Sequence, residues 1–260
     1  MNHKAQSLSI FFTVLIVGLP LATWGLSLLL SKSKDLTLSN FFKSSWSKFV
    51  ALVSKKPTLF ALSLILMIIT PPLVMQPKGS FLSMLGTLTS AFAYISMLAC
   101  QIITYKSNSP LFEPQGELAS RNNFVMGYHL FILQLFLFFA SLLGLLFFVV
   151  PAIIFKIYTF MASPISVCEC KSLGAMWRSF KLCKAHFWDV AKISLPFLIC
   201  INTPLVILPA LRHAIEEPVV LTMALTAVRI FEFFANTLSW QCQSMLYDYQ
   251  KRPGEAENQS

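Results

Sequence analysis

The chain has 260 residues, of which 56% are hydrophobic and only 12% are charged, and its mean hydropathy is +0.68. This composition excludes an ordinary soluble domain, in which about a quarter of the residues are charged, and predicts a polytopic membrane protein. The net charge of +9 resembles that of nucleic-acid-binding proteins, but the basic residues fall between apolar runs, where they set orientation in a membrane. We therefore expect membrane lipids as partners, and no nucleic acid.

Seven apolar runs are candidates for crossing a bilayer, which takes about 20 residues of helix. The first run is longer than the core of a signal peptide and is followed by Lys32 and Lys34, so we expect an uncleaved anchor. In the third run, Gly86 and Ser90 are four apart, which lets a neighbouring backbone approach closely. The expected spans are residues 9–30, 58–75, 80–104, 125–150, 152–167, 193–211 and 219–247.

Two basic segments between the spans have the spacing of surface helices. In residues 36–56 and again in residues 171–192, aromatic and aliphatic side chains recur every three or four positions, with lysines between them. A helix with basic and aromatic faces lies at the membrane surface, and its basic side chains attract anionic head groups. The lipid contacts expected in the second segment are Trp177, Arg178, Lys181, Lys184 and Trp188.

The basic residues are concentrated on one side of the predicted membrane, because every second connection carries most of them. Connections after the first, third and fifth spans, together with the C-terminal tail, hold 15 of the 20 Lys and Arg residues, against three in the remaining connections. Because cytoplasmic connections carry the Lys and Arg excess, we expect the N-terminus outside and the C-terminus in the cytoplasm. The expected domains are an anchor, residues 1–31, a helical membrane domain, residues 32–252, and a disordered tail, residues 253–260.

The predicted fold class is therefore an all-α bundle of about seven transmembrane helices, with two basic amphipathic helices on its cytoplasmic face. A basic helix followed by two spans occurs at residues 36–104 and again at residues 171–247. This order suggests an internal duplication, as in some membrane folds. The alternative is that any multi-span protein with basic inner connections has this appearance.

Several residues in the second half of the chain occur in a characteristic order. Glycine and proline close one span, a proline ends the next, and an Arg-Ser pair opens the basic helix. The pattern consists of Gly144, Pro151, Pro164, Ala175, Arg178, Ser179, Leu182 and Phe187, and ends with Leu246, Tyr247 and Asp248.

This order resembles the YciC-type bacterial inner-membrane proteins, which are related to the membrane domain that some bacteria fuse to glycerophosphodiester phosphodiesterases. The resemblance covers residues 38–252. It implies a multi-pass protein of a bacterial inner membrane, and it implies no catalytic residue, because that family has none assigned.

The sequence contains no motif of a familiar enzyme class. Gly-rich phosphate loops, His-Glu-x-x-His and Gly-x-Ser-x-Gly are all absent from it. Three thiols and an imidazole, those of Cys168, Cys170, Cys183 and His186, are the right ligand types for zinc, but the Cys-x-Cys spacing is tighter than usual for a zinc site. We interpret the cysteines as small apolar residues and expect no enzyme activity, no metal and no cofactor.

The last expected span carries polar residues at helical spacing. Arg229 lies about 15 Å from Pro218, near the middle of a membrane. A charge there costs about 2.5 kcal/mol or more unless it is compensated, so we expect Arg229 to be neutralised by Glu232 on the same face. The residues of this polar stripe are Thr222, Arg229, Glu232 and Asn236, followed by Ser239 and Gln243.

The polar stripe has two interpretations. It could line a hydrated groove or a site for a polar head group. It could equally be internal contact that fixes helix rotation, because polar contacts between membrane helices are common although each contributes only about 0.6 kcal/mol. The amides that could join it are those of Gln101, Gln134 and Asn202.

Three functional hypotheses follow. The first is a non-catalytic protein with a structural, assembly or lipid-organising role, with anionic lipids and other membrane proteins as partners. The second is a small transporter or permease in which the polar stripe faces the path. The third, implied only by the resemblance, is an accessory subunit of an enzyme acting on phospholipid-derived substrates.

Overall fold

The computed structural model describes residues 19–30, 38–74, 79–108, 123–147, 149–169, 171–215 and 217–257. Throughout these ranges the regular structure is α-helix, without strands, as the composition predicted. The helices are α2 (Leu19–Leu30), α3 (Leu38–Lys55), α4 (Pro57–Val74), α5 (Phe81–Asn108), α6 (Asn123–Phe147), α7 (Val149–Tyr158), α8 (Ala162–Glu169), α9 (Leu173–Ala185), α10 (Phe187–Ala214) and α11 (Pro218–Glu257).

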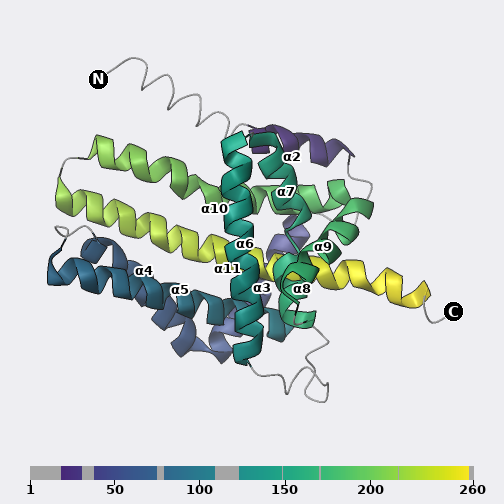
Figure 1. Cartoon of the computed structure of the whole chain (residues 1–260), viewed down its shortest axis with the longest axis horizontal. Coiled ribbons are helices and arrows are strands. Elements are labelled where there is room, and N and C mark those ends of the chain that lie inside the picture. The colour runs from purple at the N-terminus through teal and green to yellow at the C-terminus, as the bar shows by residue number, and fades with distance from the viewer. Residues whose placement is uncertain are drawn as a thin grey trace.

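Two long hairpins, α4 with α5 and α10 with α11, form the body of the molecule. They run alongside one another, and their connecting ends lie at the same end of the molecule, at the left of Figure 1. α11 joins them, because it packs against α4 and α5 as well as against α10. Each hairpin is preceded along the chain by a basic helix, α3 or α9, which is the order that the sequence indicated.

Five of the helical segments are long and apolar enough to cross a membrane. This length and composition support a membrane protein, but they do not establish the seven spans that the sequence predicted. The first expected span, residues 9–30, lies partly outside the described residues, and its described part is α2. The five segments are Pro57–Val74, Phe81–Ser107, Asn123–Ser141, Val150–Glu169 and Pro218–Gln250.

The span expected at residues 152–167 is interrupted in its middle. α7 ends at Tyr158 and α8 begins at Ala162, with a turn between them. Pro164 explains the interruption, because it has no N–H to donate to the carbonyl of Phe160 and its ring crowds that carbonyl. The first seven residues of α8, from Ala162 onwards, are buried. This part of the chain therefore fills the protein interior.

α6 has a different direction from the hairpins. Figure 1 shows it running across α4, α5, α10 and α11, and it packs against α5, α7 and α8. α6 has the length and composition of a membrane span, but it does not run parallel to the helices of the two hairpins.

Gly86 allows the first hairpin to close tightly. A Cβ atom at this position would lie 2.8 Å from the carbonyl carbon of Leu73 and 2.8 Å from the backbone nitrogen of Val74. The close approach expected at Gly86 is therefore confirmed. Ser90, one turn later, donates its hydroxyl to the carbonyl of Gly86 at 2.8 Å.

The last helix continues beyond the expected membrane domain. α11 has 40 residues and ends at Glu257, so it extends past residue 253, where we expected a tail to begin. Its 33-residue apolar part, Pro218–Gln250, is about 50 Å long at 1.5 Å per residue. That exceeds the roughly 30 Å of a hydrocarbon core, so part of α11 lies outside it in any crossing near the normal.

Replacing Gly86 by Ala should loosen the first hairpin, because the new methyl group meets backbone atoms of α4. We expect the free energy of unfolding to fall by about 1–3 kcal/mol, measured by thermal unfolding in detergent micelles. Gly25→Ala is the matched control, since nothing lies within 4 Å of a Cβ at this other helical glycine. Equal effects of the two substitutions would contradict the close packing.

Candidate polar pocket

A cavity of about 320 Å³ lies between α4, α5, α6 and α11. α11 contributes charged and amide groups to it, and α5 and α6 contribute amides and a phenol. We call this cavity the polar pocket. Its polar lining residues are Tyr94, Gln101, Gln134, Arg229, Glu232 and Asn236, and the other lining residues are Met67, Ala93, Met97, Leu98 and Trp240.

An ion pair lies on the α11 side of the polar pocket. The Nη1 atom of Arg229 lies 2.6 Å from Oε2 of Glu232, and 39% and 24% of these side chains are exposed. Residues three apart share one face of a helix, which brings the two groups together. The expected pairing of Arg229 with Glu232 is confirmed. Asn236, one turn further on, donates its Nδ2–H to the Glu232 carbonyl at 2.9 Å.

Thr222 belongs to the predicted polar stripe but does not line the polar pocket. Its hydroxyl donates to the carbonyl of Pro218 at 2.8 Å, which keeps it at the first turn of α11. Seven residues of helix, about 10 Å, separate it from Arg229. The pocket therefore brings together three of the six residues that we predicted for the stripe, Arg229, Glu232 and Asn236.

Amide groups close the other side of the polar pocket. Gln134 of α6 donates its Nε2–H to Oε1 of Gln101 on α5 at 2.5 Å. In turn, its own Oε1 accepts a hydrogen bond from the hydroxyl of Tyr94 at 2.9 Å. The sequence indicated both glutamines but missed Tyr94. The available signal was that Tyr94 precedes Gln101 by seven residues, two turns, on the same face of one helix.

The hydrogen bonds continue from the pocket into the protein. Gln101 donates its Nε2–H to the hydroxyl of Tyr105 at 2.9 Å, and this hydroxyl donates to Oε1 of Gln243 at 2.5 Å. The amide of Gln243 then reaches Ser239 Oγ at 3.3 Å. Because Tyr105 is fully buried, this chain of bonds fixes α5 against α11. The side chain of Asn202, the third amide that we expected here, lies outside the described residues.

These bonds leave some hydrogen-bond donors of the pocket unused. Each glutamine amide carries two N–H donors, and the bonds described above use one from Gln101 and one from Gln134. Arg229 has five donors, and its described bond to Glu232 uses one of its nitrogens. The polar pocket can therefore donate to the oxygens of a ligand, and Glu232 can accept from a ligand amine or hydroxyl.

The predicted lipid contacts around α9 fall into two groups, one exposed and one packed within the protein. Trp177 is 66% exposed, and Lys181 and Lys184 are exposed beside it. Trp188 is only partly exposed, and it packs edge-on against Phe187, the first residue of α10, with ring centroids 5.1 Å apart. The first three residues are available to head groups.

Arg178, the other residue that we predicted for lipid contact, is paired within the protein. Its guanidinium lies 2.9 Å from Oε1 of Glu169, and the ammonium of Lys171 lies 3.7 Å from Oε2. The hydroxyl of Tyr247 on α11 donates to Oε1 of the same carboxylate at 3.2 Å. Arg178 and Tyr247, which both belong to the resemblance pattern, thus meet at Glu169 and connect α8, α9 and α11.

The inner face of α9 packs on α7. Phe180 stacks on Tyr158 with centroids 5.1 Å apart, and the hydroxyl of Ser179 donates to the Tyr158 carbonyl at 2.6 Å. Cys183 is fully buried, and burial raises its pKa from 9.0 to about 12, against a smaller lowering by the hydrogen bond from Ser179. Some of the apolar side chains of residues 171–192 that we expected at the membrane surface therefore lie inside the protein.

α3 has both a buried and an exposed apolar face. Phe41 and Phe49 are buried, and Ser45 between them lies 2.9 Å from Cys242 Sγ on α11. Phe42 and Trp46 are close to half exposed, and Trp46 contacts Phe49 with ring centroids 5.7 Å apart. α3 therefore packs on α11 and leaves aromatic side chains available for lipid.

Among the described residues, no three His, Cys, Asp or Glu side chains are grouped to hold a metal ion. His186 lies 3.8 Å from the carboxylate of Asp189, and Cys183 points its thiol at the carbonyl of Ile157 at 3.6 Å. Cys170 lies outside the described residues.

The chain was compared with protein-family models, with curated proteins and with solved structures, and no match was found. The resemblance to the YciC-type family therefore stays a prediction.

Removing Glu232 alone should destabilise the protein more than removing the whole ion pair, because Glu232→Leu leaves Arg229 uncompensated beside lipid. We expect a loss of about 1–2 kcal/mol for Glu232→Leu, discounted because both side chains are partly exposed, and a smaller loss for Arg229→Leu/Glu232→Leu. Thermal unfolding in lipid nanodiscs measures both. A double variant less stable than the single one would contradict this pairing.

Cys183 should resist alkylation in the folded protein. With a pKa of about 12 in place of 9.0, its reactive thiolate is about a thousandfold rarer at pH 8, and its burial blocks access as well. The measurement is the rate of maleimide labelling by mass spectrometry, with the exposed position Trp177→Cys on the same helix as control. Similar rates at the two positions would contradict the packing of α9.

Proposed function

We propose that the protein is a non-catalytic, multi-pass protein of a bacterial inner membrane that binds and organises lipid, and that the polar pocket receives a lipid head group. One observation carries the proposal. The Arg229–Glu232 ion pair belongs to an apolar 33-residue segment and faces an open cavity. A purely structural pair could instead be sealed against neighbouring helices.

The chemistry of the polar pocket suits a zwitterionic head group. Its ion pair offers a cation and an anion 2.6 Å apart, and the amides of Gln101 and Gln134 add N–H donors. A phosphate would accept charge-assisted hydrogen bonds from Arg229, and an ammonium group would donate to Glu232. A purely anionic head group would be attracted by the first residue and repelled by the second.

The depth of the pocket agrees with entry from the cytoplasmic leaflet. Arg229 and Asn236 lie about 16 and 27 Å along α11 from Pro218, in a hydrocarbon core about 30 Å thick. The polar pocket then extends from the middle of the bilayer to its inner boundary. We orient the hairpin ends outwards because the excess of basic residues belongs to the other side, with the N-terminus outside and the C-terminus in the cytoplasm.

The basic helices support a lipid-organising role at the same boundary. Trp177, Lys181 and Lys184 of α9 are exposed, as are Phe42 and Trp46 of α3. Each basic side chain near an anionic membrane surface contributes about 1 kcal/mol to binding. These helices would hold anionic lipids around the protein, separately from the single head group in the polar pocket.

A transporter remains the second candidate, and one observation favours it. Polar residues extend from Arg229 through the pocket to Gln243, over about 21 Å of α11. A water-filled path there would let polar reagents label single cysteines introduced along residues 222–243, including deep positions. Protection of the deep positions supports the lipid-binding role.

Head-group binding should depend on the ion pair. We expect Arg229→Leu/Glu232→Leu to weaken retention of phosphatidylethanolamine by about tenfold or more, because each hydrogen bond to a charged group contributes about 1.5–3 kcal/mol. Native mass spectrometry of the protein released from nanodiscs measures the retained lipid. Thr222→Val, on the same helix but outside the pocket, should retain lipid normally. Equal retention by all three proteins would refute the head-group site.

A further inference from the structure

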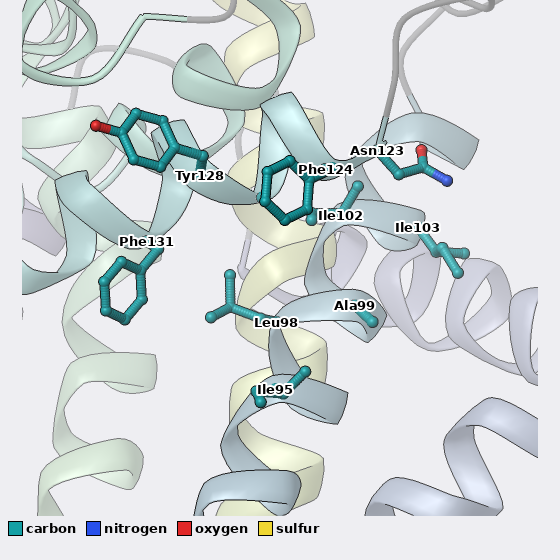
Figure 2. Close-up of a pocket in the computed structure, with 10 residues that line it drawn as sticks. Ile95, Leu98, Ala99, Ile102, Ile103, Asn123, Phe124, Tyr128 and Phe131 are labelled. Carbon is teal, nitrogen blue, oxygen red and sulfur yellow. The ribbon is translucent and has the colours of Figure 1, made fainter.

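A second, apolar cavity of about 510 Å³ lies between α5 and α6. Figure 2 shows Leu98 and Ile102 of α5 facing Phe124 and Phe131 of α6 across it, with Ile95 at one end. The only lining residues with polar side chains are Asn123 and Tyr128. In Figure 2 the hydroxyl of Tyr128 points away from the other side chains. We call this cavity the apolar groove.

The apolar groove adjoins the polar pocket. Leu98 lines both cavities. Tyr94 lines the polar pocket and meets Phe131 of the apolar groove edge to face, with ring centroids 6.4 Å apart. On α6, Phe131 and Gln134 are three residues, or about 4.5 Å, apart along one face. A molecule lying along this face of α6 therefore passes from apolar to polar surroundings.

The energetics of a membrane require that the two cavities act together. A hydrocarbon chain that leaves lipid for an apolar groove gains little, because lipid tails are as apolar as the groove. The groove alone therefore confers no selectivity. A head group bound at Arg229 and Glu232 supplies the missing free energy, and the groove then determines where the attached chain lies.

The size of the apolar groove favours a chain over a protein segment. An α-helix about 10 Å wide occupies about 420 Å³ per turn of 5.4 Å. A cavity of about 510 Å³ thus holds little more than one turn of a partner helix. It lies within the 300–1,000 Å³ range of small-ligand sites.

We infer that the polar pocket and the apolar groove form one site for a single zwitterionic phospholipid of the surrounding bilayer. Its head group lies at Arg229 and Glu232, and one acyl chain lies in the groove between α5 and α6. This inference rests on the proposed function, and it adds the class of ligand and the path of its chain.

Gly127 offers a way to block the groove without touching the head-group site. A Cβ atom there would lie 3.5 Å from Cδ1 of Ile102, an ordinary contact, so Gly127→Ala fits. Gly127→Phe would instead fill the groove. Ala99→Phe, which blocks it from α5, is a second occluding variant in case one of them does not fold.

The experiment uses the full-length protein in vesicles of phosphatidylethanolamine and phosphatidylglycerol. A trace of phosphatidylethanolamine carries a photoactivatable diazirine on one acyl chain, and the cross-linked peptides are identified by mass spectrometry. We expect cross-links in α5 and α6 at groove residues. They should be unchanged in Gly127→Ala and reduced about tenfold in folded Gly127→Phe or Ala99→Phe.

The outcomes separate this inference from the proposed function. Retention that depends on the ion pair, without cross-links in the groove, overturns the inference and leaves the head-group site intact. Groove cross-links that persist in Arg229→Leu/Glu232→Leu overturn both. Equal labelling by a phosphatidylglycerol probe overturns selection of a zwitterionic head group. Cross-links from the groove to a second polypeptide show that the groove is a protein interface and overturn the inference as well.

Discussion

A charge on an apolar helix must be compensated, and the rest of the account depends on how this chain meets that constraint. Arg229 is compensated by Glu232, three residues further along α11, at 2.6 Å. The pair needs no help from another helix, which leaves neighbouring helices free to surround it without sealing it. The cavity beside the pair is polar and open, as the proposed head-group site requires.

The direction of α6 gives this site its form. Both cavities are lined by residues of α5 and α6, and Leu98 contributes to each. The cavity nearer α11 receives the charges and amides, and the other has almost entirely apolar walls. Further along α11, Tyr247 contacts Glu169, which also pairs with Arg178, and these contacts connect α8 and α9 to α11. The hairpin of α4 and α5 instead closes through near-backbone contact at Gly86.

Local patterns in the sequence predicted much of this structure, and contacts between distant segments account for what they missed. Apolar runs and prolines predicted an all-helical membrane class, and the three-residue spacing predicted the ion pair. The turn before Pro164 was readable in principle, but the length and composition of residues 152–167 concealed it. The angle of α6 and the role of Tyr94 depend on which helix lies opposite, and no periodicity within one segment carries that information. The burial of Cys183 against α7 was not predicted, for the same reason.

The proposed topology places both hairpins in one bilayer, with their connecting ends on the side opposite to the basic helices. The most direct measurement is membrane-impermeant maleimide labelling of single cysteines in intact cells, in a background without native cysteines. The exposed positions Ser47 on α3 and Lys184 on α9 test one side, and Gly79 and Glu217 at the hairpin ends test the other. We expect labelling at Gly79 and Glu217 only. Labelling of either basic helix, or of only one hairpin end, would contradict it.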